Sequence, residues 1–346
     1  MNLPTKLVTT TGLISGTLIV ISGNHWMMTW IGLELNMLAA LTIIMKPKHP
    51  RTAEAAIKYF LTQAIASAMI LYASTINATQ TGQWDMSAMT NKYACTMLLL
   101  ALTIKLGTIP MHFWLPEVMQ GTATTTALII ASWQKIAPIS IMLMTCNHLP
   151  QNMMVAMGLL SIIIGGLGGI NQTQLRKLMA FSSISNLGWT LTIFSISPFM
   201  ATVNIMIYMI TLSPSFMIMK KTSLKTLQNL TTAWTSSPLA NTLLMLLLLS
   251  LSGLPPLTGF TPKIMILNEL TTQNLTPLAA TMTLASLISL MFYIRTTYIT
   301  AMVTPPMTPA STTKWRTPPA HKKLTSAAIP PSLIILPLMP LLLAMT

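Results

Sequence analysis

Long apolar segments follow one another along almost the whole sequence, and they limit what this chain can fold into. Hydrophobic residues make up 52% of the 346 residues, and charged residues make up only 7%. Soluble domains carry about 25% charged residues, so this chain has too few charges to cover a surface that faces water. The sequence therefore predicts an all-α polytopic membrane protein, in which the bilayer is the main solvent.

We expect about eleven transmembrane helices, because eleven segments are long and apolar enough to span a hydrocarbon core of roughly 30 Å. Residues 1–346 are treated as one membrane domain, in which residues 301–326 form a basic, proline-rich loop. The other long connections are residues 79–92 and 220–237. The expected helices lie near residues 7–23, 26–45, 53–78, 93–119, 122–145, 152–170, 174–197, 199–219, 238–270, 276–300 and 327–346.

The distribution of basic residues supports this number of helices. With eleven spans, Lys92 is the only one of the 19 basic residues that would lie on the side opposite the N-terminus. Lys105, Lys135 and Lys263 lie deep within expected helices, and all the others lie in loops or near helix ends on the N-terminal side. Basic residues are concentrated in the cytoplasmic or matrix loops of membrane proteins. The N-terminus is therefore predicted to face the cytoplasm or matrix, and the C-terminus the opposite compartment.

Several classes of function are disfavoured by the motifs of this sequence. The net charge of +14 is spread between apolar segments without a nucleic-acid-binding motif, so we expect no nucleic-acid partner. Cys95 and Cys146 are the only cysteines, which argues against a disulfide framework or a thiolate metal site. The GGLGG segment at residues 165–169 lacks the strand and the Lys-Ser/Thr signature of a nucleotide loop, and we expect it to be a contact between helices.

Two of the expected helices, the fourth and the ninth, are predicted to be broken. Residues 106–117 read LGTIPMHFWLPE and residues 252–263 read SGLPPLTGFTPK, so one glycine and two prolines coincide at an offset of 146 residues. The two helices are five spans apart and would cross the membrane in opposite directions. Paired interrupted helices of this kind are typical of an inverted repeat around a transport site. We therefore expect approximate inverted halves at residues 1–147 and 150–300.

Ionisable side chains within the expected helices define the candidate site. Glu34 and Lys105 are the natural pair, and Lys135 is expected to extend the series towards Lys263 at the second break. Ionisable residues inside a membrane are costly and usually lie beside water or an opposite charge. Burial favours the neutral form of a lysine, whereas a nearby carboxylate favours its charged form. A series of such lysines is therefore suited to passing protons across the membrane.

Other ionisable residues have alternatives that the sequence leaves open. His112, in the first break, is either a proton relay or a hydrogen-bonded packing residue. Lys105 and Lys263 have the alternative of extending towards the membrane surface. Glu54 and Lys58 are one helical turn apart and are expected to form a surface pair. For Glu117 the alternative to a functional role is that it only places a negative charge at the end of its half-helix.

The motifs resemble those of the antiporter-like membrane subunits of NADH:ubiquinone oxidoreductase, respiratory complex I. The resemblance implies a subunit of the mitochondrial inner membrane that translocates protons, driven by quinone reduction elsewhere in the complex. The resembling segments cover nearly the whole chain in order: WIGLELNML (30–38), EAAIKYFLTQA (54–64), KLGTIPMHFWLPEV (105–118), WQKIAPIS (133–140), INQTQLRK (170–177) and GLPPLTGFTPK (253–263).

The resemblance also implies roles for particular residues and partners. Glu34 and Lys105 match the family's Glu–Lys pair, and Lys135 and Lys263 match its central and distal lysines. Many family members have a histidine where this sequence has Asn186, which does not titrate near neutral pH, so water is expected to carry the proton there. The family's NADH, FMN, iron–sulfur and ubiquinone sites lie on other subunits. Expected partners are other complex I membrane subunits, including neighbouring antiporter-like subunits, and lipids.

Two alternatives use the same ionisable residues. The first is a stand-alone cation/proton antiporter, which activity of the purified single chain would distinguish from a subunit of a complex. The second is a scaffold in which the buried lysines only couple conformational changes between neighbouring subunits. Normal proton pumping by a correctly assembled lysine variant would favour that second alternative.

Overall fold

A computed structural model of the chain describes residues 3–302, 323–333 and 337. These residues are helical apart from short connections, and no strand occurs among them. The all-α prediction is therefore confirmed for this part of the chain. The predicted loop at residues 301–326 and the predicted last helix at residues 327–346 lie largely outside the described residues, although α16 (Lys323–Leu333) is helical.

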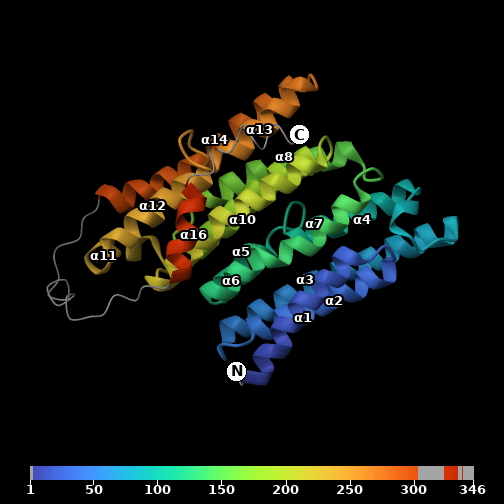
Figure 1. Cartoon of the computed structure of the whole chain (residues 1–346), viewed down its shortest axis with the longest axis horizontal. Helices are drawn as coiled ribbons and strands as arrows, with labels where there is room; N and C mark the ends of the chain where they lie inside the picture. Colours follow the sequence, from blue (N-terminus) through green and yellow to red (C-terminus); the bar gives the residue numbers. More distant parts are fainter. Residues whose placement is uncertain (1–2, 303–322, 334–336, 338–346) are drawn as a thin grey trace. The chain divides into compact units, whose positions relative to one another are not determined.

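The helices follow the predicted order, and most of their ends fall within a few residues of the predicted positions (Figure 1). The first part of the chain forms α1 (Leu3–Ser22), α2 (Trp26–Ile44), α3 (Pro50–Thr81), the 3-10 turn η1 (Met86–Ala88), α4 (Lys92–Leu106), α5 (Trp114–Gly121), α6 (Thr124–Ala131) and α7 (Trp133–Thr145). The second part forms α8 (Gln151–Ile170), α9 (Leu175–Phe194), α10 (Pro198–Lys221), α11 (Leu227–Ser236), α12 (Pro238–Ser252), α13 (Phe260–Thr272) and α14 (Thr276–Met302).

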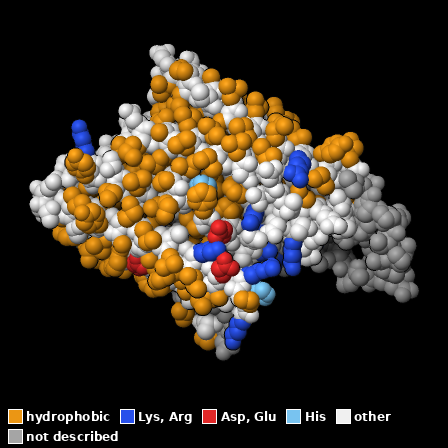
Figure 2. Space-filling model, turned by 180° about the vertical axis from the view of Figure 1, so that it is seen from behind, with side chains coloured by type: hydrophobic (Ala, Val, Ile, Leu, Met, Phe, Trp, Pro, Cys, Tyr) orange, Lys and Arg blue, Asp and Glu red, His pale blue; other side chains and the backbone are white. Residues whose placement is uncertain are grey.

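Seven helices in the described part of the chain are long and apolar enough to cross a membrane, counting α6 and α7 as one. The others in this set are α1, α2, α3, α8, α10 and α14. Large apolar side chains on these helices are exposed, among them Leu18, Met206 and Leu284. Figure 2 shows one face that is mostly hydrophobic, with most of its lysine and arginine side chains toward the lower centre. Such extended apolar surfaces are typical of contact with lipid or with another membrane protein.

The described residues divide into two compact units. Unit 1 takes in residues 1–160 and 194–198, and unit 2 takes in residues 161–193 and 199–346, in both cases as far as they are described. In unit 1, α1 and α2 lie side by side (Figure 1), and their backbones approach closely at two glycines. A Cβ atom added to Gly16 would lie 2.9 Å from the Gly32 carbonyl oxygen. Small residues permit such close packing between membrane helices.

In unit 2, the GGLGG segment belongs to α8 and makes the predicted contact between helices. A Cβ atom added to Gly165 would lie 2.8 Å from the backbone nitrogen of Ser185 on α9. The same addition to Gly166 would place an atom 3.0 Å from the side chain of Ile288 on α14. These glycines therefore allow α8 to pack closely against two neighbouring helices.

Both predicted breaks are present in the structure. The first lies between α4 and α5, and the second lies between α12 and α13, so each span is divided into pieces of 15 residues or fewer. In both cases the first piece ends at a glycine in the left-handed region, Gly107 with φ 77° and Gly253 with φ 82°. Glycine adopts this conformation without steric cost, which is why it so often ends a helix.

A third interruption, which we did not predict, divides the fifth span at Ser132. Ser132 has φ −115° and ψ −75°, and α6 ends before it while α7 begins after it. Pro138 lies inside α7 and has no N–H to donate to the carbonyl oxygen four residues earlier in the helix. Lys135 lies in the first turn after the interruption. A buried lysine thus accompanies this break as well.

The predicted connection at residues 220–237 also contains a helix, α11. The Thr226 side-chain hydroxyl caps it by accepting a hydrogen bond from the Asn229 N–H at 3.4 Å. Leu227, Leu230 and Ala233 are buried at three-residue intervals, so one face of α11 packs against the rest of unit 2. The sequence carries this spacing, but its polar residues led us to expect a loop.

Gly259, at the end of the second break, provides a test of this packing. A Cβ atom at this position would collide with the carbonyl oxygen of Ser250, which belongs to the backbone and cannot rotate away. We expect Gly259→Ala to destabilise the protein by about 3 kcal/mol, the upper end of the usual range for overpacking. The measurement is the midpoint of thermal unfolding of the assembled protein in detergent.

The matched control is Gly82→Ala, because an added Cβ atom there meets nothing within 4 Å. Gly82 has φ 71°, so this substitution carries only the strain of a left-handed alanine, about 1 kcal/mol. A fall in the midpoint for Gly259→Ala no larger than that for Gly82→Ala would contradict the close approach.

Candidate functional site

The predicted site residues fall into one group in each unit. Each broken helix contributes a lysine to the group in its own unit, and of these Lys105 is buried and Lys263 is half-buried. Unit 1 holds Glu34, Lys105, His112 and Lys135, and unit 2 holds Asn186 and Lys263.

Glu34 and Lys105 are brought near one another from α2 and α4. Lys105 lies in the last turn of α4, two residues before the capping glycine, and its side chain is buried. Glu34 is half-buried and lines an open groove of about 650 Å³ between α2 and α3. The two side chains interact electrostatically. They are not in direct contact, since both ion pairs found in the described part of the chain involve Lys58.

A polar network, which we did not identify from the sequence, links the helices that carry these residues. Gln134 Nε2 on α7 donates to Oδ1 of Asn36 on α2 at 3.0 Å. The Tyr59 hydroxyl on α3 donates to Oε1 of Gln134 at 3.4 Å, and its ring packs edge-on against Trp114 on α5. The indole N–H of Trp114 donates to the carbonyl oxygen of Ile104 near the end of α4 at 3.0 Å. This network fixes the surroundings of the first broken helix.

Lys135 and His112 are both deeply buried. Lys135 is 2% exposed, and its backbone N–H bonds to the Ser132 carbonyl oxygen at 3.1 Å in the first turn of α7. His112 lies within the first break, where its ring contacts Phe113 and hydrogen-bonds the backbone of Pro110. The Nδ1 atom of His112 has no hydrogen-bond partner in the described part of the chain. Buried nitrogen atoms of this kind are usually satisfied by ordered water.

Lys263 lies in the first turn of α13 and bridges the second break. Its Nζ atom donates to the carbonyl oxygen of Ser252, the last residue of α12, at 2.7 Å. The same atom lies 5.8 Å from the centre of the Trp189 ring on α9. Carbonyl oxygens at the end of a helix carry partial negative charge, and the face of an indole attracts cations. Both interactions favour an ammonium group at this position.

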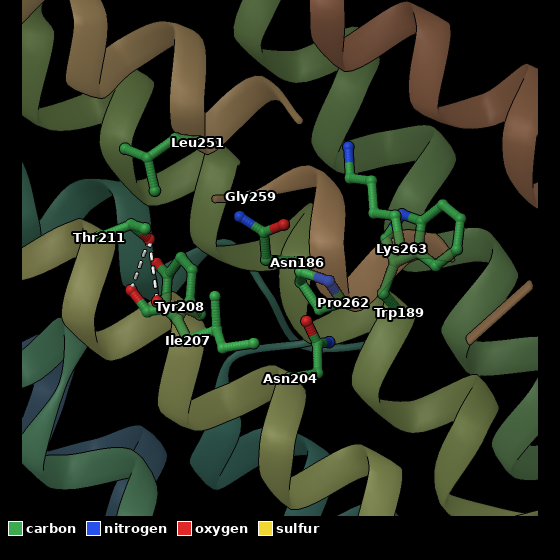
Figure 3. A pocket seen from close by; sticks show the side chains of 10 residues that line it. All are labelled: Asn186, Trp189, Asn204, Ile207, Tyr208, Thr211, Leu251, Gly259, Pro262 and Lys263. Carbon is green, nitrogen blue, oxygen red and sulfur yellow. Dashed lines mark hydrogen bonds between the residues drawn. The ribbon is translucent and has the colours of Figure 1, made fainter. Parts of the chain in front are cut away.

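A cavity of about 20 Å³ lies beside Lys263 (Figure 3). Asn186 of α9, together with Asn204 and Tyr208 of α10, forms its polar part. In Figure 3 the two asparagine side chains lie on either side of Pro262. A polar cavity of this volume accommodates about one water molecule. Asn186 thus lines this cavity, and the expectation that water carries the proton there stays a prediction.

Lys58 makes one contact that the sequence predicts and one that it does not. The expected pair with Glu54 is present, with Nζ and Oε1 at 2.5 Å. Lys58 Nζ also lies 2.7 Å from Oε2 of Glu117, and this second ion pair joins α3 to α5 directly after the first break. All three side chains are exposed, and exposed ion pairs contribute little to stability. The functional site of unit 1 therefore does not depend on this cluster for its stability.

The Gln134–Asn36 hydrogen bond leads to a prediction about stability. We expect Gln134→Leu to destabilise the protein by about 1–3 kcal/mol, because it leaves the buried Asn36 side chain without its donor. Asn36→Leu alone should also destabilise the protein, because it leaves the Gln134 side chain without its acceptor. The double variant should be more stable than the sum of the single losses predicts, since it removes both members of the Gln134–Asn36 pair; the Tyr59 hydroxyl loses its acceptor in Gln134→Leu and in the double variant alike. Strictly additive changes in the midpoint of thermal unfolding would contradict this interaction.

Known proteins match this chain over nearly its whole length. Residues 23–289 match the family described as NADH:quinone oxidoreductase/Mrp antiporter, transmembrane. NADH-ubiquinone oxidoreductase chain 2 of Varanus timorensis is 49% identical over 344 residues, which cover 99% of this chain and 100% of the relative. The protein of the same name from Gallus gallus is 45% identical over 345 residues and covers 100% of both chains.

Solved structures of multi-subunit membrane complexes contain chains with the same fold. A chain of respiratory complex I from Thermus thermophilus with bound aureothin has a TM-score of 0.79 and 24% identity, covering 94% of this chain and 77% of its own. A chain of the Mrp complex from Dietzia sp. DQ12-45-1b has a TM-score of 0.74 and 18% identity, covering 88% and 61%. With the family match and the full-length relatives, the conclusion is that this chain belongs to the NADH:quinone oxidoreductase/Mrp antiporter family of transmembrane proteins.

Proposed function

We propose that the chain is a core membrane subunit of proton-pumping NADH:ubiquinone oxidoreductase and that it moves protons through Glu34, Lys105, Lys135 and Lys263. The observation that carries this proposal is the pairing of each broken helix with a buried or half-buried lysine, in a chain whose full-length relatives are NADH-ubiquinone oxidoreductase chain 2. The chain is a multi-pass protein of the mitochondrial inner membrane, and its partners are the other membrane subunits of the complex.

The physical basis of the proposal is that each break exposes polar backbone groups, which can stabilise the charge of a lysine side chain. Non-helical backbone is tolerated at membrane depth only where it is buried in protein or lines a water-filled cavity. Backbone groups freed by the break, and the water they retain, reduce the cost of an ammonium group beside them. Moving one charge against 100 mV takes roughly 2.3 kcal/mol. A change of less than about two pKa units in such a lysine supplies that work, at roughly 1.36 kcal/mol for each unit.

The residues have different roles in the proposed transfer. Glu34 borders an open groove and interacts with Lys105, so its charge controls the preference of Lys105 for a proton. Lys135 follows the interruption at Ser132 and receives the proton next. Lys263, held by the Ser252 carbonyl oxygen, is the last lysine of the series. His112 is a candidate relay within the first break because its buried Nδ1 has no partner in the described part of the chain.

We also propose eleven spans, ten of them arranged as two inverted halves of five. This is supported by α4 and α12, which begin and end at residue numbers that differ by 146, the offset at which the sequence motifs coincide. The second pieces α5 and α13 also begin at residue numbers that differ by 146. Each first piece has a glycine cap with positive φ. The counterparts α1 and α8 are both 20 residues long.

The proposal includes the orientation of the chain and the location of the redox sites. The distribution of basic residues supports an N-terminus on the matrix side and a C-terminus on the intermembrane side. NADH, FMN, iron–sulfur clusters and ubiquinone are proposed to bind other subunits. Within the described residues there is no group of three or more His, Cys, Asp and Glu side chains suited to a metal.

Substitution of Lys135 and Lys263 tests the proton path. Lys135→Met and Lys263→Met remove the charge while nearly preserving the side-chain length, so we expect fewer protons pumped for each electron transferred. Lys92→Met is the matched control, because Lys92 is exposed at the start of α4, and it should leave the ratio unchanged. The measurement is proton uptake and NADH oxidation in the same vesicles. An unchanged ratio in both Lys135→Met and Lys263→Met, with the complex intact, would favour the scaffold alternative.

A stand-alone cation/proton antiporter is the second candidate, favoured by the likeness of fold to a chain of the Mrp complex. A native gel of mildly solubilised membranes separates the two candidates. We expect the chain to migrate with the high-mass band that stains for NADH dehydrogenase activity. Migration as a small species, together with antiport activity of the purified chain in vesicles, would overturn the complex I proposal.

A further inference from the structure

The polar cavity beside Lys263 contains one buried group whose hydrogen-bonding capacity is not met. Asn204 is 6% exposed, and its Nδ2 atom has no hydrogen-bond partner in the described part of the chain. The other polar side chains of α10 at this cavity are already engaged. Thr211 donates to the carbonyl oxygens of Ile207 and Tyr208, and the Tyr208 hydroxyl interacts with Ser183.

The size and chemistry of the cavity identify its occupant. A buried amide nitrogen without an acceptor costs about 1–3 kcal/mol, so Asn204 requires a hydrogen-bond acceptor. The cavity of about 20 Å³ holds about one water molecule and is too small for a multi-atom anion. Lys263 contributes a cationic group to the same lining, which disfavours a bound cation. A neutral molecule that both accepts and donates hydrogen bonds satisfies all of these conditions, and water is that molecule.

We propose that Asn204 holds a single water molecule beside Lys263, and that this water carries the proton past Asn186. Asn204 is thereby a positioning residue, which acts on the proton through the water. The inference rests on the proposed function and adds to it a residue that none of the sequence motifs indicates.

The surroundings of Lys263 fit a proton exchange with this water. An ammonium group has three N–H donors, and the bond to the Ser252 carbonyl oxygen uses one of them. Lys263 also lines the cavity, although its Nζ atom points away from the two asparagines in Figure 3, so exchange with a water molecule there requires a turn of the lysine side chain. Water can accept that proton while donating another, whereas neither asparagine gains or loses a proton near neutral pH. Asn186 on α9 and Asn204 on α10 come from different helices, and both line the cavity (Figure 3).

The test combines a structure with a measurement of pumping, both on the assembled complex. A map at a resolution that shows waters should contain a peak within hydrogen-bonding distance of Asn204 Nδ2, and Asn204→Leu should remove it. We expect the rate of proton pumping to fall about fivefold in the same variant, the change that loss of one ordinary hydrogen bond to the water would produce. The number of protons pumped for each electron transferred should fall with it. Asn204→Ser, which keeps a polar group and leaves more room for water, should retain most of the pumping.

The matched control is Asn241→Leu, since Asn241 is also buried in unit 2 but its Nδ2 atom already donates to the Leu230 carbonyl oxygen at 3.1 Å. This control should lower the stability or the amount of complex without changing the protons pumped for each electron. An equal loss of pumping in Asn204→Leu and Asn241→Leu would overturn the positioning role.

Two further outcomes separate this inference from the proposed function. If Asn204→Leu loses the water but pumps normally while Lys263→Met does not, the inference is wrong and the proposed function stands. If Lys263→Met also pumps normally, the proposed function is wrong, and the role of the water fails with it. Absence of any water peak beside Asn204 in the unaltered complex would overturn the inference directly.

Discussion

A helix that breaks inside a membrane leaves backbone carbonyl and N–H groups that hydrocarbon cannot hydrogen-bond, and the rest of this structure depends on how those groups are satisfied. At each of the two predicted breaks, a side chain from the second piece bonds a carbonyl oxygen at the end of the first. Trp114 donates to Ile104 at the first break, and Lys263 donates to Ser252 at the second. The capping glycines allow the chain to turn sharply enough for these bonds to form.

The two breaks use this arrangement differently. At the first break, the neutral indole N–H of Trp114 donates to the carbonyl oxygen. Lys105 lies in the piece before this break, where it interacts with Glu34. At the second, the lysine itself takes the carbonyl oxygen. Hydrogen bonds from a charged donor are roughly twice as strong as neutral ones, so the protonation of Lys263 and the closure of the second break stabilise one another. A proton that leaves Lys263 therefore weakens the contact that holds α12 and α13 together.

Much of the fold followed from composition and from glycine and proline positions. The fourth span is predicted at residues 93–119, and the structure has α4 from Lys92 and α5 to Gly121. The interruption at Ser132 was missed because Pro138 lies in a continuous apolar run, and a single proline in a membrane helix does not require a break. The helix α11 was missed because its surface is polar, although its buried positions follow a helical spacing.

The candidate site was predicted only as far as its ionisable residues. A lysine or glutamate within an apolar segment is visible in the sequence, and so is the i,i+4 pair of Glu54 and Lys58. The contact of Lys58 with Glu117 joins residues far apart in sequence and has no local signal. The same holds for Trp189 beside Lys263 and for Asn204 in the cavity, where a neutral asparagine in a membrane helix gives no indication of what it faces. Tertiary packing alone selects these partners.

The central claim is that buried ionisable groups of this chain change protonation while the complex turns over. Infrared difference spectra of the reduced and oxidised complex report this directly, because a carboxyl group gains a C=O stretching band when it is protonated. The account predicts a carboxyl band that shifts in D₂O and is lost in Glu34→Gln. Spectra of Glu34→Gln that are identical to those of the unaltered complex, at normal turnover, would contradict it.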